Sequence, residues 1–116
     1  MKEITIWHNP RCSKSRQTLE LLQAKGHDPR VVRYLDDSPS VSEIRKLLKM
    51  LGCQPRELMR TKEALYKELD LAQVEDDKAL IQAMVEHPKL IERPIVTCGQ
   101  RAAIGRPPES VLSVLE

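Results

Sequence analysis

The first third of the chain changes from a two-residue spacing of apolar positions to a helical spacing and back. Ile4–Trp7 alternates with period two, is rich in β-branched residues and ends before Asn9, which predicts a strand. Apolar positions then recur at helical spacing from Ser13 until Gly26, a residue type at which helices commonly end. Residues 31–35 have the pattern of a second strand. This order predicts a βαβ unit, with a right-handed crossover if the strands are parallel.

The middle of the chain carries only helical signals. Ser40 and Glu43 have the S-x-x-E spacing of a capping box, and the apolar positions after them predict a helix that ends at Gly52. Further helical segments are predicted near residues 55–59, 62–69 and 77–87. We therefore expect an all-helical insert at about residues 40–90.

The last part of the chain predicts a hairpin and a final helix. Residues 95–97 and 101–104 flank a turn segment that contains Gly99, and Pro107 precedes a helical repeat of apolar positions. The order of elements is therefore βαβ, helical insert, ββα. This order is typical of an α/β, thioredoxin-like fold with a four-stranded mixed sheet, and we expect residues 1–116 to form a single domain.

Composition and charge narrow the possible partners. The 116 residues are 41% hydrophobic and 31% charged, as in globular proteins, and no apolar run approaches the ~18 residues of a membrane span. A net charge of +2 with few aromatic residues argues against nucleic acid as a partner but leaves a small anion possible. The three scattered cysteines form no disulfide framework and no Cys or His residues have paired ligand spacing, so we expect a reduced, cytoplasmic protein without a metal.

The most informative segment is residues 8–16, because it places Cys12 between the first predicted strand and the first predicted helix. Unpaired backbone N–H groups, the helix dipole and the side chains of Arg11, Lys14 and Arg16 all favour a thiolate there. At an ordinary pKa of about 8.5 only about 3% of a thiol is ionised at pH 7, and a pKa of about 6.5 would raise that to roughly 75%. Cys12 is the predicted nucleophile, and the alternative is a small buried hydrophobic residue.

Cys12 has no partner thiol within its own turn of helix. Position 15 is Ser15, so the motif is Cys-x-x-Ser, and a second thiol must come from Cys53, Cys98 or another molecule. Cys53 follows a predicted helix end and Cys98 lies in the predicted hairpin turn. We expect spectator roles for both.

Two arginines stand directly before prolines, in Arg93-Pro94 and Arg106-Pro107. A residue before proline is restricted to extended backbone geometry, so each guanidinium projects from a constrained position at a strand end. Arginine binds oxyanions through a planar fork that lysine cannot reproduce. Arg60 is a third candidate, which gains little from its local sequence.

Three motifs together carry a resemblance to a known family. Residues 8–16 contain HNPxCxxSR, residues 92–96 are ERPIV and residues 104–108 are IGRPP. This combination resembles the glutaredoxin-coupled arsenate reductase (ArsC) family, in particular its chromosomal ArsC-like branch, and the similarity runs essentially end to end. It implies a thioredoxin-like fold with a helical insert and a cis peptide bond between Arg93 and Pro94.

The resemblance also implies roles for single residues. Cys12 would attack arsenate as the thiolate. The oxyanion would be held by Arg60, Arg93 and Arg106. The supporting residues would be His8 and Ser15, which help to keep Cys12 ionised, and Asn9 and Arg16, which shape the loop.

The implied reaction borrows an outside thiol. Glutathione would be a co-substrate that attacks the thiol-arsenate adduct, glutaredoxin would then take the glutathione from the mixed disulfide, arsenite would be released, and no cofactor would be tightly bound. Two alternatives stay open, namely a glutathione-dependent thiol oxidoreductase without a role in arsenate reduction and an Spx-like regulator that binds RNA polymerase. Spx-type regulators typically carry Cys-x-x-Cys, whereas this chain has Ser15, and they lack its arginine set.

Overall fold

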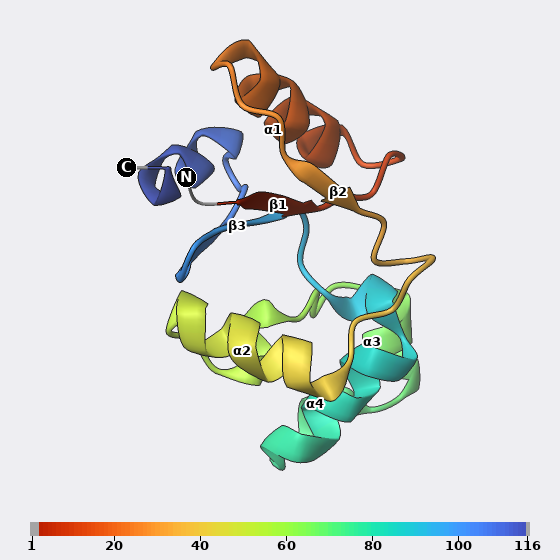
Figure 1. Cartoon of the computed structure of the whole chain (residues 1–116). Helices are drawn as coiled ribbons and strands as arrows, with labels where there is room; N and C mark the ends of the chain where they lie inside the picture. The colour runs from red at the N-terminus through yellow and green to blue at the C-terminus, as the bar shows by residue number, and fades with distance from the viewer. Residues whose placement is uncertain (1–2, 116) are drawn as a thin grey trace. The chain divides into compact units, whose positions relative to one another are not determined.

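The computed structural model describes residues 3–115, and its elements follow the predicted order along the chain (Figure 1). The chain folds as two compact units. The sheet unit combines the chain up to Asp37 with the chain from Arg93 onward, and the helical unit is residues 38–92. The helical unit is the segment in which the sequence predicts an insert, at about residues 40–90.

Four strands form one mixed sheet in the sheet unit. They are β1 (Ile4–Trp7), β2 (Arg30–Val32), β3 (Ile95–Cys98) and β4 (Arg101–Ile104), in the spatial order β2-β1-β3-β4. β1 pairs in parallel with β2 and antiparallel with β3, which pairs antiparallel with β4. Helix α1 (Ser13–Ala24) makes the crossover between the two parallel strands. The predicted α/β, thioredoxin-like fold with a four-stranded mixed sheet is thereby confirmed.

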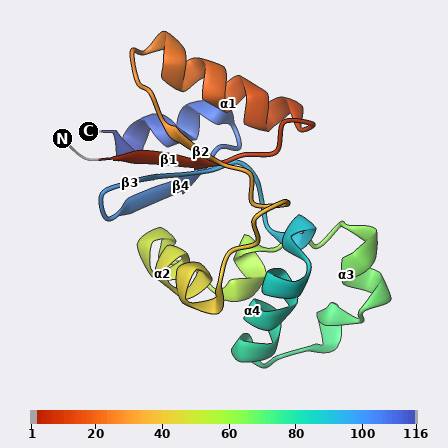
Figure 2. The same ribbon diagram turned by 45° about the vertical axis from the view of Figure 1, so that its right-hand side comes forward.

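The core of the sheet unit lies between the sheet and two helices that cover the same face of it. These helices are α1 and η4, a 3-10 helix at Pro108–Val114, which lie side by side in Figure 2 and contact each other. Ile6 and Val96 are direct partners across β1 and β3, so both side chains point into this core. The core cluster consists of Ile6, Leu22, Val96, Cys98, Val111 and Val114.

The place of Cys98 differs from the sequence prediction. Cys98 is the last residue of β3, paired with Arg101, and its side chain is only 6% exposed. The hairpin turn consists of Gly99 and Gln100 alone, because the two strands pair up to its edge. Cys98 is therefore a core residue and not a turn residue.

The second strand is shorter than predicted. β2 pairs with only three residues of β1. One further backbone hydrogen bond joins the two segments beyond the strands, from the N–H of His8 to the carbonyl of Val32, at 2.8 Å. The chain then turns, because the N–H groups of Asp36 and Asp37 both donate to the carbonyl of Arg33. The prediction of a strand over residues 31–35 is thus wrong at both ends, and its last residues belong to this turn.

The helical unit begins at the predicted capping box. The hydroxyl of Ser40 accepts the N–H of Glu43 and the carboxylate of Glu43 accepts the N–H of Ser40, both at 3.1 Å, and Gly52 ends the helix with a φ of +67°. The unit contains α2 (Val41–Leu51), η1 (Pro55–Leu58), α3 (Ala64–Glu68), η2 (Leu71–Gln73), α4 (Asp77–Glu86) and η3 (Pro88–Leu90). None of the helices formed by residues 3–115 is long and apolar enough to cross a membrane.

Gly105 is required where β4 returns to the start of β3. Its N–H donates to the carbonyl of Pro94 at 2.8 Å, so the two backbones are in contact. A Cβ atom at this position would lie 2.8 Å from both Pro94 Cγ and Thr18 Oγ1, closer than real Cβ contacts come. The missing side chain at Gly105 therefore allows Arg93 and Arg106, which flank this contact, to approach the first helix.

Candidate active site

Cys12 occupies the residue immediately before α1, at the end of the loop that follows β1. Its N–H donates to the carbonyl of Asn9 at 3.0 Å, and its own carbonyl accepts the N–H of Arg16 at 3.0 Å, the first bond of the helix. The side chain is 9% exposed and makes no capping hydrogen bond, unlike the Ser, Thr, Asn or Asp side chains common at this position. The backbone N–H groups of Lys14 and Ser15, at the start of the helix, therefore act on the sulfur of Cys12.

The surroundings of Cys12 favour its thiolate. Burial by itself raises the pKa of the thiol, but the backbone N–H groups of Ser15 and Lys14, together with the guanidinium of Arg93, lower the pKa by more. Burial by itself lowers the pKa of the Arg93 guanidinium. The contacts of Arg93 with Cys12 and with Tyr34 together have the larger effect and raise this pKa above its ordinary value. The net result is a lowered pKa for Cys12 and a firmly charged Arg93 beside it.

Arg106 is the second arginine at this sulfur. Its Nη2 lies 3.9 Å from the Sγ of Cys12, and its Nε donates to the carbonyl of Arg93 at 2.7 Å. The Nε of Arg93 is buried and has no hydrogen-bond partner among residues 3–115. The peptide bonds to Pro94 and Pro107 are both cis, the first of them as the resemblance implied. The structure thus brings Cys12, Arg93 and Arg106 together, and one buried N–H donor of Arg93 has no partner among residues 3–115.

Ser15 and His8 form a buried pair under this loop. The Oγ of Ser15 accepts the N–H of Asn9 at 3.0 Å and lies 2.6 Å from the Nδ1 of His8. Burial, followed by the positive charges of Arg33 and Arg16, lowers the pKa of His8, which favours the neutral form of its ring. The Ser15 hydroxyl is therefore directed to His8, and it is the Ser15 backbone N–H that acts on Cys12.

Asn9 and Arg16 brace the loop from two sides. The Oδ1 of Asn9 accepts the N–H of Arg11 at 3.0 Å, which fixes a tight turn before Cys12. The Nη1 of Arg16 donates to the carbonyl of Pro10 at 3.0 Å and so ties the first turn of α1 back to the loop. Both side chains hold backbone rather than sulfur.

Arg60 belongs to the helical unit. Its guanidinium pairs with Glu63 at 3.1 Å and with Glu92 at 3.6 Å, and about a quarter of the side chain is exposed. Cys53, in the same unit, is half-buried, and burial together with the charge of Glu57 raises the pKa of its thiol. The structure therefore surrounds Arg60 with carboxylates and leaves Cys53 a weaker nucleophile than Cys12.

Tyr34 is a residue of this site that the sequence analysis does not single out. It is fully buried, stacks on Trp7 with ring centroids 6.4 Å apart, and its phenol contacts Arg93. The available signal was weak, because Tyr34 was assigned to the second strand and only the parallel pairing of β1 with β2 brings it beside Trp7. Tyr34 therefore contacts Arg93, whose guanidinium in turn stabilises the thiolate of Cys12.

This fold and this site define a thioredoxin-like protein with one reactive cysteine, at the start of its first helix and held by two arginines. The chain belongs to the ArsC family, whose family model matches residues 7–114. An arsenate reductase from Vibrio cholerae has a similar structure, with a TM-score of 0.95 and 54% identity over 97% of this chain and 98% of that one.

Two curated relatives are similar over nearly their whole length. The protein YfgD of Escherichia coli, which is uncharacterised, is 56% identical over 116 residues, or 98% of each chain. An arsenate reductase of Neisseria meningitidis serogroup A is 49% identical over 117 residues, covering 99% of this chain and all of that one.

Replacing Arg93 tests the source of the lowered thiol pKa. Arg93→Gln removes the positive charge beside Cys12, so the apparent pKa of Cys12 should move to higher pH. The measurement is the rate of iodoacetamide alkylation of the Cys12 peptide against pH, followed by mass spectrometry. Arg16→Gln, which removes an arginine that bonds only to backbone, is the matched control. An unchanged profile in Arg93→Gln would contradict this assignment.

Replacing Ser15 separates its hydroxyl from its backbone. Ser15→Ala leaves the N–H of Asn9 and the Nδ1 of His8 buried without their partner, which should cost about 1–3 kcal/mol of unfolding free energy in urea denaturation. The Cys12 pKa should move much less than in Arg93→Gln, because the Ser15 N–H remains in place. A rise in pKa as large as that of Arg93→Gln would mean that the hydroxyl, and not the backbone, stabilises the thiolate.

Proposed function

We propose that this protein is an arsenate reductase, with Cys12 as the nucleophile and Arg93 and Arg106 as oxyanion ligands. The observation that carries the proposal is the contact of the Cys12 thiolate with two guanidinium groups, one of which has a buried Nε without a partner among residues 3–115. A buried donor with no partner is costly unless a ligand satisfies it. A tetrahedral oxyanion offers the acceptor oxygens that such a donor requires.

The first step is a condensation at arsenic. The Cys12 thiolate attacks As(V), an As–O bond breaks, and the departing oxygen leaves as water after taking up protons, so that a thiol-arsenate adduct remains. Two guanidinium groups lower the barrier because they stabilise the negative charge that gathers on the other oxygens. Phosphate has the same shape and charge and is expected to bind there, but it does not accept the electrons of the next step.

The second step needs a second thiol, and the cysteines of this chain are poor sources of it. Cys98 is packed in the core of the sheet unit and Cys53 belongs to the helical unit, where its thiol pKa is raised. We propose glutathione as the co-substrate. Its thiolate attacks the Cys12 sulfur, an S–S bond forms, and the electron pair of the S–As bond stays on arsenic, which leaves as arsenite. The two thiols are oxidised to a mixed disulfide, and arsenic is reduced by two electrons.

The mixed disulfide must then be opened. We propose that glutaredoxin takes the glutathione from Cys12 by thiol–disulfide exchange and so restores the free thiolate. This cycle requires no tightly bound cofactor, and it requires a reducing compartment, for which we propose the cytoplasm.

The other residues named by the resemblance are given roles that agree with their contacts. His8 and Ser15 support Cys12 from below the loop, and Asn9 and Arg16 hold the loop backbone. Arg60 is proposed as a third oxyanion ligand, which requires it to exchange a carboxylate contact for the substrate.

The test is arsenate-dependent oxidation of NADPH in the presence of glutathione, glutaredoxin and glutathione reductase. Wild type should turn over, Cys12→Ser should be inactive, and Arg106→Gln should lose on the order of 100-fold in kcat/KM for arsenate. Cys53→Ser is the matched control and should keep full activity. Turnover that survives in Cys12→Ser, or a wild type without any arsenate-dependent turnover, would rule out the proposed function.

A further inference from the structure

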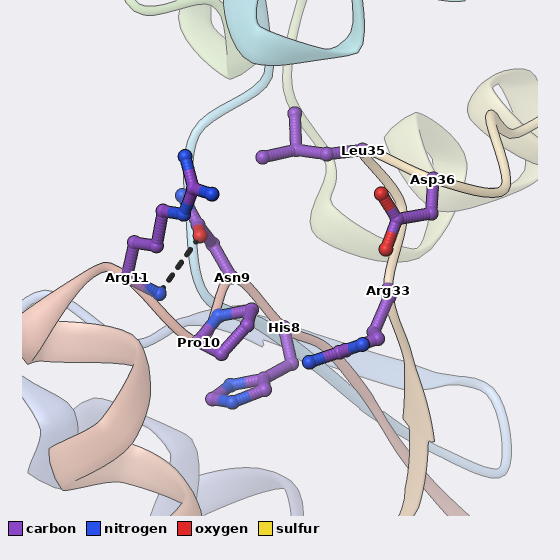
Figure 3. Close-up of a pocket in the computed structure, with 7 residues that line it drawn as sticks. All are labelled: His8, Asn9, Pro10, Arg11, Arg33, Leu35 and Asp36. Carbon is purple, nitrogen blue, oxygen red and sulfur yellow. Dashed lines mark hydrogen bonds between the residues drawn. The ribbon is translucent and has the colours of Figure 1, made fainter.

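A charged pocket opens on the sheet unit beside the Cys12 loop (Figure 3). Its volume is about 340 Å³, which is within the range of small-molecule sites. One wall is the loop between β1 and α1 and the other is the turn that follows β2, as Figure 3 shows. The lining residues are His8, Asn9, Pro10, Arg11, Arg33, Leu35 and Asp36.

The pocket presents charges of both signs that do not neutralise each other. In Figure 3 the Arg11 guanidinium lies across the pocket from Arg33 and Asp36. Within residues 3–115 no ion pair of 4.0 Å or less joins the carboxylate of Asp36 to either arginine. Ion pairs between exposed side chains contribute little to stability, so these groups can stay apart and remain available to a ligand. Here the carbonyl of Arg33 accepts the N–H of Asp36, so both residues are fixed by the same turn.

The charges of Arg11, Arg33 and Asp36 indicate which charged groups a ligand of this pocket should carry. A carboxylate of the ligand can be held by Arg11 or Arg33 through a planar fork, and an ammonium can be held by Asp36. A phosphate or arsenate dianion would meet the carboxylate of Asp36, which would repel it. The pocket therefore fits a zwitterion, and the two groups of opposite charge on one carbon are those of a free α-amino acid end. Leu35, which is 40% exposed, offers an apolar surface for a short methylene chain.

The pocket adjoins the loop that carries the nucleophile, and Cys12 itself is not one of its lining residues. Arg11 immediately precedes Cys12, and Asn9, another lining residue, accepts the N–H of Cys12 at 3.0 Å. In extended glutathione seven bonds separate the γ-glutamyl α-carbon from the sulfur, a distance of roughly 9 Å. A ligand anchored at Arg33 and Asp36 can thus place its thiol toward the Cys12 side of the loop.

We propose that this pocket binds the γ-glutamyl end of the thiol co-substrate, with Asp36 holding its α-ammonium and Arg33 and Arg11 its α-carboxylate. The identity of the co-substrate as glutathione rests on the proposed function, whereas the zwitterion specificity rests on the pocket alone. Such an anchor raises the effective concentration of the thiol at Cys12 and selects against thiols that lack a glutamyl end. Neither Arg93 nor Arg106 lines the pocket, so a ligand bound there does not have to displace either arginine from Cys12.

The direct test measures binding of S-methylglutathione, which has no free thiol, to the full chain by calorimetry and by NMR. Asp36→Asn and Arg33→Gln should each raise the Kd by about tenfold or more, because each removes a charge-assisted hydrogen bond. Asp37→Asn and Arg30→Gln are matched controls, being exposed neighbours outside the pocket, and should leave the Kd unchanged. S-methylcysteinylglycine, which lacks the glutamyl end, should bind wild type at least about tenfold more weakly, and this comparison needs no variant.

These binding measurements do not depend on arsenate, so the two proposals can fail separately. If arsenate turnover is absent but S-methylglutathione binds with this pattern, the pocket assignment holds and the proposed function fails. If arsenate is reduced, Asp36→Asn should raise the KM for glutathione about tenfold and leave the KM for arsenate unchanged. The pocket assignment is overturned if S-methylglutathione does not bind wild type, if the Kd is the same in Asp36→Asn, or if inorganic phosphate displaces the ligand from the Arg33 side of the pocket.

Discussion

A negative charge on a nearly buried sulfur is the constraint on which the rest of this structure depends. Burial alone would keep Cys12 protonated, so the fold has to supply more stabilisation than burial removes. It does so from two sources, the N–H groups at the start of α1 and the guanidinium of Arg93. The first source is local and comes with any helix that begins at a cysteine. The second is brought in by the fold.

The topology of the sheet explains how that second source arrives. β3 lies next to β1 in the sheet although most of the chain separates them, and the residues just outside β3 and β4 therefore reach the loop that follows β1. Arg106 meets Cys12 across 94 positions of sequence in this way. The close contact at Gly105 permits the approach, and the buried ring of Tyr34 supports Arg93 from the β2 side. The helical unit is inserted between these parts of the chain and leaves the pairing of β1 with β3 intact.

The elements that could be predicted from the sequence are those with local causes. The alternation in Ile4–Trp7 and the reciprocal bonds of Ser40 and Glu43 depend on neighbours within a few residues, and both are found as predicted. The end of β2 could not be predicted, because it is set by how many residues of β1 remain to pair with. Cys98 was misplaced for the same reason, since strand pairing decides where the hairpin turn begins.

In the candidate site too, features with local causes could be predicted from the sequence and features that depend on strand pairing could not. A cysteine between a strand and a helix indicates a thiolate from sequence alone, because its N–H donors are adjacent in the chain. The contact of Tyr34 with Arg93 and the pocket formed by Arg33 and Asp36 require the parallel pairing of β1 with β2, which a single sequence does not display. The direction of the Ser15 hydroxyl, toward His8, also required the folded loop.

The central claim is that Cys12 and an outside thiol together supply the two electrons that reduce arsenic. The most direct test incubates the protein with arsenate and glutathione, omits glutaredoxin, and quantifies arsenite together with the disulfide state of each cysteine by peptide mass spectrometry. The account predicts one glutathione bound to Cys12 for each arsenite formed, with Cys53 and Cys98 still reduced. Arsenite formed with Cys12 unmodified, or with Cys12 joined to Cys53 or Cys98, would contradict it.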